Sequence, residues 1–254
     1  MQAVSIIAMK LSEFVCVLEE IAPSEQALDF DHGRIGLMLD RGGDVAKVAV
    51  SLDPTDFVLK EAGRIGVDLL ITHHALIFDP ITMLSHTLSD SLKIALLNDF
   101  SLYVMHTNFD GASGGINDVL AEILGLRDIE SCGISRIGEI KPCCGIEEFS
   151  RLVADRLNTH VLWVGNGLVE RVMVVGGSGF GDEYIDLACE QGVDVLVSGE
   201  LRHSASRYAN ARGLSLVDAT HYATENPGMK HLCERLPIES VFIDDDPLVG
   251  VIER

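Results

Sequence analysis

Short apolar segments alternate with helical patterns along almost the whole chain, and this alternation restricts the folds that are open to it. Apolar stretches at 45–52, 68–72 and 102–105 are separated by segments whose apolar residues recur at helical spacing, such as 11–21. Apolar strands without polar alternation are typical of parallel sheets that helices cover on both faces. The sequence therefore predicts an α/β fold with mainly parallel sheets.

The second half of the chain repeats the order of the first. The segment GVDLLIT at 66–72 corresponds to GVDVLVS at 192–198, and HTNFD at 106–110 corresponds to HYATE at 221–225. Self-similarity of this kind indicates a repeated structural unit. We therefore predict two similar α/β/α halves.

The length of 254 residues suffices for two compact domains. We expect a first α/β domain over 1–130 and a second over 131–254. The C-terminal strand predicted at 240–243 has the option of returning to the sheet of the first domain.

The chain is strongly acidic, with 19 basic and 39 acidic residues and a formal net charge of −20. Such a surface is repelled by phosphate backbones and anionic lipids. The charge therefore argues against a nucleic-acid or membrane-surface protein and leaves a small-molecule substrate as the expected partner.

Location is predicted from three features of the chain. It has no apolar run of 18 residues, and its N-terminal stretch lacks the basic region and cleavage site of a secretory signal. Its six cysteines are scattered without a CxxC pair, which is typical of reduced thiols. We expect a cytoplasmic protein.

Histidines and acids follow the predicted strands at the point where each strand ends. His73 and His74 come directly after the strand at 68–72, and neighbouring side chains on an extended chain point to opposite sides, so the pair can reach two different ions. His106 and Asp110 follow the next strand. Ligands bind at the carboxyl ends of strands in α/β sheets, so these residues are candidates for one site.

The second half carries a matching pair, His221 and Glu225. On a helix these two side chains would lie one turn apart on the same face, as chelating pairs do. Imidazole and carboxylate donors without thiolate fit Zn, Mn, Fe, Ni or Co. The number of donors predicts two divalent ions per chain, between the two halves; the alternative is a set of helix-capping acids and hydrogen-bonded histidines.

Other motifs have two readings each. GGSGFG at 176–181 is either a tight turn or a phosphate-binding turn before a helix, and the first reading is favoured. Glu200, Arg202 and His203 either contact substrate or begin a helix. The adjacent Cys143 and Cys144 are interpreted as ordinary thiols rather than a redox pair. The remaining histidines are expected at the surface or at an interface: His32, His86, His160 and His231.

In these motifs the chain resembles the Nif-three-like dinuclear metal-centre family, which includes YbgI-like proteins labelled GTP cyclohydrolase I type 2. The matching pieces run in order over nearly the whole chain: ITHHALIF at 71–78, HTNFD at 106–110, GGINDVLAEILGL at 114–126, GGSG at 176–179, GVDVLVSGE at 192–200 and DATHYATE at 218–225.

The resemblance implies a two-domain α/β fold, a ring-shaped homohexamer and two metal ions that face the interior of the ring. Carried over residue by residue, it implies a ligand set and places His106 beside the metals. The implied ligands are His73, His74, Asp110, His221 and Glu225.

The chain departs from the family pattern at three places. GRIGLML at 33–39 replaces a characteristic early strand, Ala75 stands where proline often follows the two histidines, and Thr220 stands where glycine often precedes the last histidine. None of these changes removes an implied ligand. The first predicts a different pocket floor.

The favoured function is a dinuclear metal-dependent hydrolase in which metal-activated water attacks a nucleotide-type substrate, as the family label of GTP ring opening implies. Asp110 or Glu225 would bridge or orient the ions, and His106 would move a proton. The alternatives are a non-enzymatic metal-binding or metal-delivery hexamer and a regulatory scaffold that contacts nucleic acid.

Overall fold

The computed structural model of the chain describes residues 8–250 and divides it into two compact α/β units. Of the described residues, the first unit comprises 8–113 and 229–246, and the second comprises 114–228 and 247–250. The predicted α/β class is confirmed. Among the described residues, no helix combines the length and apolar composition that a membrane span requires.

The first unit is built on a five-stranded sheet. Its strands lie in the order β13 (Glu239–Phe242), β4 (Lys47–Ser51), β5 (Leu69–Thr72), β6 (Ser101–Val104) and β2 (Gly36–Leu39). The first four run parallel, and β2 pairs antiparallel with β6 at the edge. The centre of the sheet is fully buried, which explains why its strands are continuously apolar in sequence.

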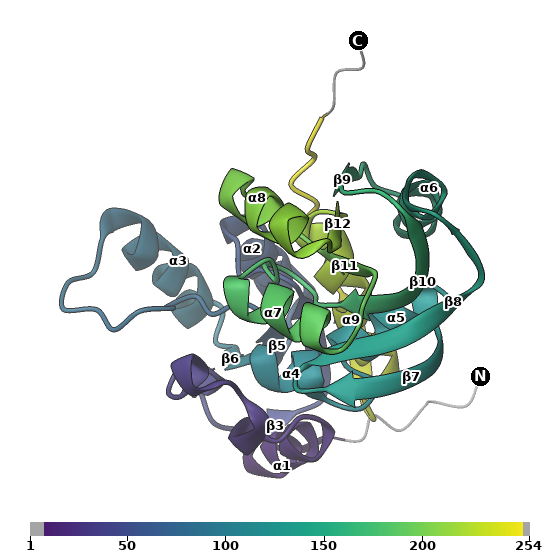
Figure 1. Ribbon diagram of the computed structural model, residues 1–254. Helices are drawn as coiled ribbons and strands as arrows, with labels where there is room; N and C mark the ends of the chain where they lie inside the picture. The colour runs from purple at the N-terminus through teal and green to yellow at the C-terminus, as the bar shows by residue number, and fades with distance from the viewer. Residues whose placement is uncertain (1–7, 251–254) are drawn as a thin grey trace. The chain divides into compact units, whose positions relative to one another are not determined.

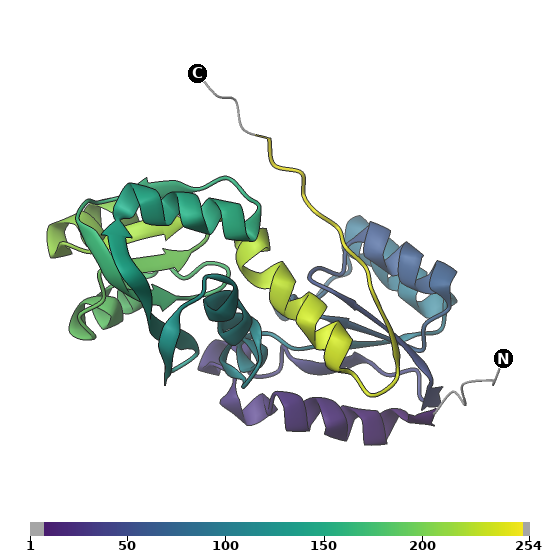
Figure 2. The ribbon, with the colours of Figure 1, turned by 90° about the vertical axis from the view of Figure 1, so that its right-hand side faces the viewer.

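Helices cover both faces of this sheet (Figure 2). On one face, α2 (Asp56–Ile65) and α3 (His86–Leu97) pack against apolar residues of the three central strands. On the other face lies α1 (Leu11–Ile21), where Tyr103 of β6 donates a hydrogen bond to Glu19 at 2.6 Å. A short two-stranded sheet of β1 (Met9–Lys10) and β3 (Asp44–Val45) precedes β4.

The second unit has a six-stranded mixed sheet. Its order is β7 (Arg127–Cys132), β8 (Ser135–Gly145), β10 (Leu168–Val174), β11 (Val195–Ser198), β12 (Ser215–Asp218) and β9 (Leu162–Val164). Only β10, β11 and β12 run parallel, and antiparallel strands flank them on both sides. The parallel arrangement is therefore complete in the centre of the sheet and absent from its edges.

Two apolar clusters lie on the two faces of the second sheet. One contains residues of α5 (Ile116–Ile123) and α6 (Ile146–Leu157), and the other contains residues of α7 (Asp182–Glu190) and α8 (His203–Arg212). In Figure 1, α7 and α8 lie on the opposite side of β10 from α6. This unit is thus a three-layer α/β/α sandwich, as the alternating pattern predicted.

The division of the chain differs from the predicted boundary at 130. The second unit begins at Gly114, because α5 packs with the strands of its sheet through Leu120, Ala121 and Leu124. The chain returns to the first unit within α9 (His221–Arg235), and β13 then pairs in parallel with β4. The region between 126 and 170, for which the sequence analysis assigned no elements, forms β7, β8, α6 and β9.

Candidate metal centre

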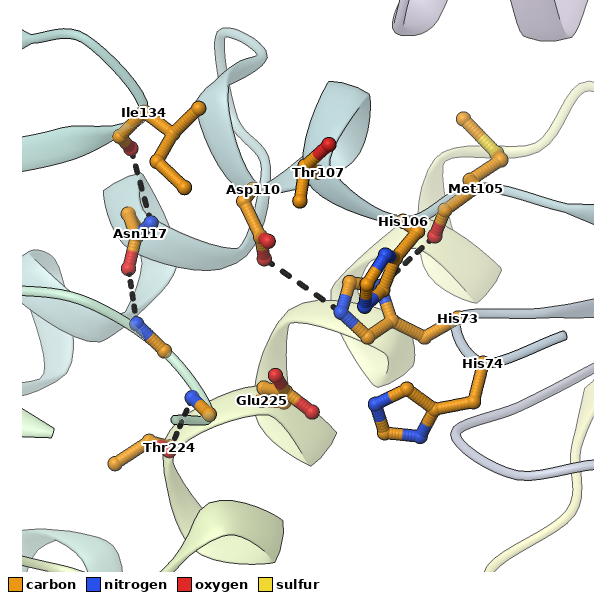
Figure 3. A network of polar contacts seen from close by, with 12 residues as sticks. His73, His74, Met105, His106, Thr107, Asp110, Asn117, Ile134, Thr224 and Glu225 are labelled. Atoms are coloured by element: carbon orange, nitrogen blue, oxygen red, sulfur yellow. Dashed lines mark hydrogen bonds and ion pairs between the residues drawn. The ribbon is translucent and has the colours of Figure 1, made fainter. Parts of the chain in front are cut away.

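Three histidines meet at the carboxyl edge of the first sheet. Because β5 and β6 are parallel neighbours, His73 and His74 after β5 and His106 after β6 emerge side by side. One ring nitrogen from each of the three lies within 4.8 Å of the others, and the His73 and His106 ring centroids are 4.8 Å apart. Figure 3 shows the three rings together. The structure thus brings these three predicted residues together within the first unit.

The ring of His73 is held in one tautomer. Its Nδ1 lies 2.8 Å from the backbone carbonyl oxygen of Met105, and its side chain is fully buried. A carbonyl oxygen can only accept a hydrogen bond, so Nδ1 carries the proton and donates it. The lone pair of the neutral ring is therefore on Nε2, the nitrogen that coordinates metals in such an arrangement.

Asp110 faces this lone pair. The short helix α4 (Thr107–Gly111) begins after His106, and the amide of Asp110 donates to the His106 carbonyl at 3.0 Å. This turn places the Asp110 Oδ1 atom 3.6 Å from Nε2 of His73 (Figure 3). Two acceptor atoms at this distance are stabilised by a cation, which is either a proton or a metal ion.

His74 and His106 are oriented by carboxylates. Asp53 accepts from Nδ1 of His74 at 2.7 Å, and Asp31 lies 2.8 Å from Nδ1 of His106. Burial raises the pKa of Asp31, but hydrogen bonds from His106 and Thr107 outweigh it and hold the pKa below the ordinary value of an aspartate. Asp31 is therefore an ionised acceptor, and His106 donates to it through Nδ1.

The two orienting carboxylates were not identified from the sequence. Asp53 follows β4 at the same sheet edge and therefore carried a signal, but an aspartate before a proline is also typical of a helix start. The structure has Thr55 as the N-cap of α2, where its hydroxyl accepts from the amide of Val58. Asp31 lies in the short 3₁₀ helix η2 (Asp29–Asp31), for which the sequence has no periodic pattern.

We expect Asp53→Asn to lower metal affinity by about 10-fold to 100-fold, the usual effect of removing a carboxylate that orients a ligating histidine. Asparagine keeps the size of the side chain but weakens the acceptor that fixes the His74 ring. Metal titration monitored by calorimetry measures the change. The matched control is Asp90→Asn, which alters the surface pair of Asp90 with His86; equal affinities in the two variants would contradict the orienting role.

The second unit has its own group of donors at the carboxyl edge of its parallel strands. His221 and Glu225 lie one turn apart at the start of α9, with Nε2 of His221 2.9 Å from Glu225 Oε2. Glu200, which follows β11, accepts from Nδ1 of His221 at 2.7 Å. Glu200, predicted either to contact substrate or to begin a helix, lies before α8 and orients a histidine.

Positive φ angles bring this second group together. Thr220 has a φ of 67° and Glu200 a φ of 62°, a region that side chains other than glycine rarely adopt. Asp218 stabilises the bend by accepting from the amide of Thr220 at 2.9 Å. Glycine is often found at the position of Thr220 in the resembled family, and this backbone conformation explains that preference. Strain of this kind concentrates at functional sites.

The GGSG turn is a structural element of this second group. The amides of Gly176, Gly177 and Gly179 donate to side chains of Asn117, Thr224 and Ser198, at 2.7, 3.0 and 2.7 Å. Figure 3 includes the first two of these contacts. Three backbone donors that a phosphate would need are thus bound within the protein, which agrees with the favoured reading of a tight turn.

A side chain at Gly177 would intrude on this second group of donors. Its φ is 67°, and a Cβ atom there would clash with the Glu225 carboxylate and lie 3.1 Å from Nε2 of His221. We expect Gly177→Ala to lower the free energy of unfolding by about 2–4 kcal/mol, from left-handed strain plus overpacking.

The control for that variant is Gly192→Ala, at a φ of 66° with open space around the position. We expect it to cost only the strain, about 1–2 kcal/mol. Urea unfolding measures both variants. Similar losses in the two would show that the glycine is needed for its backbone angle alone.

The other residues singled out from the sequence have other places in the described fold. Arg202 is the N-cap residue of α8 and His203 its first residue, so both belong to a helix start. His86 forms an i,i+4 pair with Asp90 on α3, and its side chain is 91% exposed. Cys143 and Cys144 are free thiols at the end of β8.

The donors in both units fit a divalent transition metal. They are imidazole nitrogens and carboxylate oxygens, a set that suits Zn, Mn, Fe, Ni or Co and excludes a structural thiolate site. In all four histidines Nδ1 is held by an oxygen acceptor: Met105, Asp53, Asp31 and Glu200. This arrangement is typical of metal-ligating histidines.

Comparison with known proteins gives a consistent family. The family model described as Duf34/NIF3 (NGG1p interacting factor 3) matches residues 9–246. The chain is 34% identical to a "GTP cyclohydrolase 1 type 2 homolog" of Methanocaldococcus jannaschii, covering 93% of this chain and 100% of the relative. It is 34% identical to a protein of the same name from Clostridium perfringens, covering 90% and 91%.

Among solved structures, the chain is similar to "Reduced HcgD from Methanocaldococcus jannaschii". The TM-score is 0.83 and the sequence identity 33%, over 94% of this chain and 99% of the other. The similarity thus extends over nearly the whole length of both chains.

Proposed function

Since the chain belongs to the Duf34/NIF3 family, we propose that it is a metal-dependent hydrolase of nucleotide-type substrates. The proposal requires two divalent ions per chain and draws on the donor group of each unit. Its proposed ligands are His73, His74, Asp110, His221 and Glu225.

The observation that carries this proposal is the common state of the four histidines. Each has an oxygen acceptor at Nδ1, which leaves Nε2 to face the neighbouring donors, and Nε2 of His221 lies 2.9 Å from Glu225 Oε2. Histidines that merely fill a core or cap a helix have no reason to share this state. A preorganised set of imidazole lone pairs beside carboxylates is what a metal centre requires.

The ions would supply Lewis acidity and lower the pKa of a bound water toward ~7, so that a nucleophile is present near neutral pH. The role of the chain is to position its own side chains around the ions and the bound water. Asp110 and Glu225 contribute negative charge that orients the ions. His106 is suited to move a proton through Nε2, because Asp31 accepts from its other nitrogen and fixes the orientation of the ring.

GTP is the first candidate substrate, because the two curated relatives are named for a GTP cyclohydrolase. Attack on a carbon of the guanine ring and attack on a phosphorus of a nucleotide would use the same activated water. The proposal therefore commits to hydrolysis and to a nucleotide-type substrate.

The experiment that tests the proposal is a substrate screen with metal-reconstituted protein. Protein stripped with a chelator is reloaded with Zn, Mn, Fe, Ni or Co and offered GTP, other nucleotides and simple phosphoesters. We expect turnover that rises with added metal and saturates at two ions per chain. Stoichiometric metal binding without turnover of any nucleotide would refute the hydrolase and favour metal storage or delivery.

We further propose that the chain assembles as a homohexamer in the cytoplasm. The support is the family resemblance for the ring and the scattered cysteines for the reducing compartment. Sedimentation is expected to give a particle about six times the chain mass of 27.5 kDa. A stable monomer at micromolar concentration would refute the ring.

A further inference from the structure

Two exposed aromatic rings and an arginine lie beside His106 in the first unit. Phe30 is 49% exposed and Phe78 is 41% exposed, although most phenylalanines of the described chain are buried. Both rings meet the imidazole of His106 edge-on, with centroids 6.2 Å and 5.9 Å away. Arg34 joins the same group.

The local structure explains why these rings point outward. Phe30 is the central residue of η2, and its neighbour Asp31 is buried and holds His106. Two neighbouring residues of this short turn thus have different surroundings: Asp31 holds the histidine, and Phe30 lies at the surface. Phe78 comes four residues after His74, in the loop that leads from the metal donors toward α3. Both rings are therefore attached to segments that bear donor or orienting residues.

Arg34 binds across the two rings. Its guanidinium carbon is 4.4 Å from the centroid of Phe78 and 6.0 Å from that of Phe30. The shorter distance is a stacking contact that holds the guanidinium plane beside the histidines. Phe30 is less covered by the guanidinium and more exposed, so its ring offers the larger surface to a ligand.

The charge of Arg34 is unusual for this surface. The chain has a net charge of −20, yet this cation lies beside a cluster of histidines. Its Nη2 pairs with Asp79 at 2.9 Å, and the Asp79 side chain is largely exposed. Such a pair is weak in water, so a phosphate that accepts from the guanidinium can replace the aspartate.

We propose that Phe30, Arg34 and Phe78 form the substrate-recognition wall of the centre, selecting a ligand that has both an aromatic base and a phosphate. The base stacks on Phe30, the phosphate binds Arg34, and Phe78 holds the guanidinium in place. This inference rests on the proposed function for the identity of the ligand as a nucleotide. It adds the residues that distinguish a nucleotide from a simple phosphoester.

The test is calorimetric binding of two probes, guanosine 5′-monophosphate and ribose 5-phosphate, to the metal-loaded full chain. Phe30→Leu is expected to weaken the nucleotide by about 5-fold to 150-fold through lost base stacking and to leave ribose 5-phosphate unchanged. Arg34→Gln is expected to weaken both probes by about 10-fold or more. Phe78→Leu is expected to follow Arg34→Gln with a smaller loss.

One variant is expected to strengthen binding. Asp79→Asn removes the carboxylate that competes with phosphate for Arg34, so ribose 5-phosphate is expected to bind about 1.5-fold to 5-fold more tightly. A purely structural role of the Arg34–Asp79 pair would give no gain. The metal content of every variant is measured alongside, since the wall contains none of the proposed ligands.

The matched controls are Phe57→Leu, at a phenylalanine of α2 that is 53% exposed, and Arg64→Gln, at an arginine paired with Glu61 on the same helix. Wall variants that bind like these controls, or a wild type that does not bind the nucleotide, would overturn the inference. Nucleotide binding without any turnover would refute the hydrolase and leave the wall standing. Turnover that the wall variants do not affect would support the hydrolase and refute the recognition wall.

Discussion

Replacing His74 by alanine is expected to abolish stable metal retention while the chain stays folded. The ring is half-buried at the edge of the sheet, and Asp53 fixes its tautomer, so alanine removes one preorganised donor and leaves the core of the sheet intact. The loss of affinity is expected to exceed the ~10-fold to 100-fold effect of losing an orienting carboxylate. Elemental analysis after dialysis measures retained metal.

Thermal unfolding of the same variant separates binding from folding. A metal at about 100 times its dissociation constant stabilises the native state by about 2.7 kcal/mol, and this increment is expected to disappear in His74→Ala. The metal-free proteins are expected to unfold at nearly the same temperature. His86→Ala is the control, because that histidine is 91% exposed and lies outside the cluster. Full metal occupancy in His74→Ala would refute the assignment.

The parts of the centre that could be predicted from the sequence are those that follow a strand directly. The strand before His73 is continuously apolar, and the rule that parallel strands end at one edge brings His106 beside it. The pair of His221 and Glu225 was found from the internal repeat, and helical spacing placed both residues on one face. Each of these inferences needs only sequence patterns and one general rule of sheet or helix geometry.

The orienting carboxylates could not be predicted in the same way. Asp31 and Glu200 reach their histidines from segments 75 and 21 residues away in the chain. No periodicity marks such a contact, because it depends on tertiary placement of a short turn or of a strained residue. The positive φ of Glu200 is likewise invisible in a glutamate, whereas a glycine there would have indicated it.

The unit boundary shows a different limit. The residues of α5 continue the pattern of the preceding helices, so sequence periodicity assigned that helix to the first half. Its apolar face packs with the second sheet instead, and β13 belongs to the first sheet. Whether a helix such as α5 packs on the first or the second sheet depends on which of two similar apolar sheet faces it contacts. Because both halves have the same alternating pattern, the sequence does not distinguish the two sheets.

Asp110→Asn is expected to lower the turnover number by about 10²-fold to 10⁴-fold, if the chain hydrolyses its substrate as proposed. Asparagine has nearly the same size and preserves the turn of α4, in which the amide of this residue donates to His106. It removes the negative charge that faces Nε2 of His73. A cation bound between these two groups would interact with that charge. Rates are measured at saturating metal, with metal content determined on the same samples.

The interpretation of that variant depends on a comparison with Asp90→Asn, which neutralises an aspartate of a surface pair with His86. Because both substitutions remove one charge from a chain of net charge −20, the general field of the protein changes equally in the two. A loss confined to Asp110→Asn at full metal occupancy therefore reports on the charge beside His73. Undiminished turnover in this variant would remove Asp110 from the mechanism, because an amide cannot substitute for a carboxylate in balancing the charge of a divalent ion.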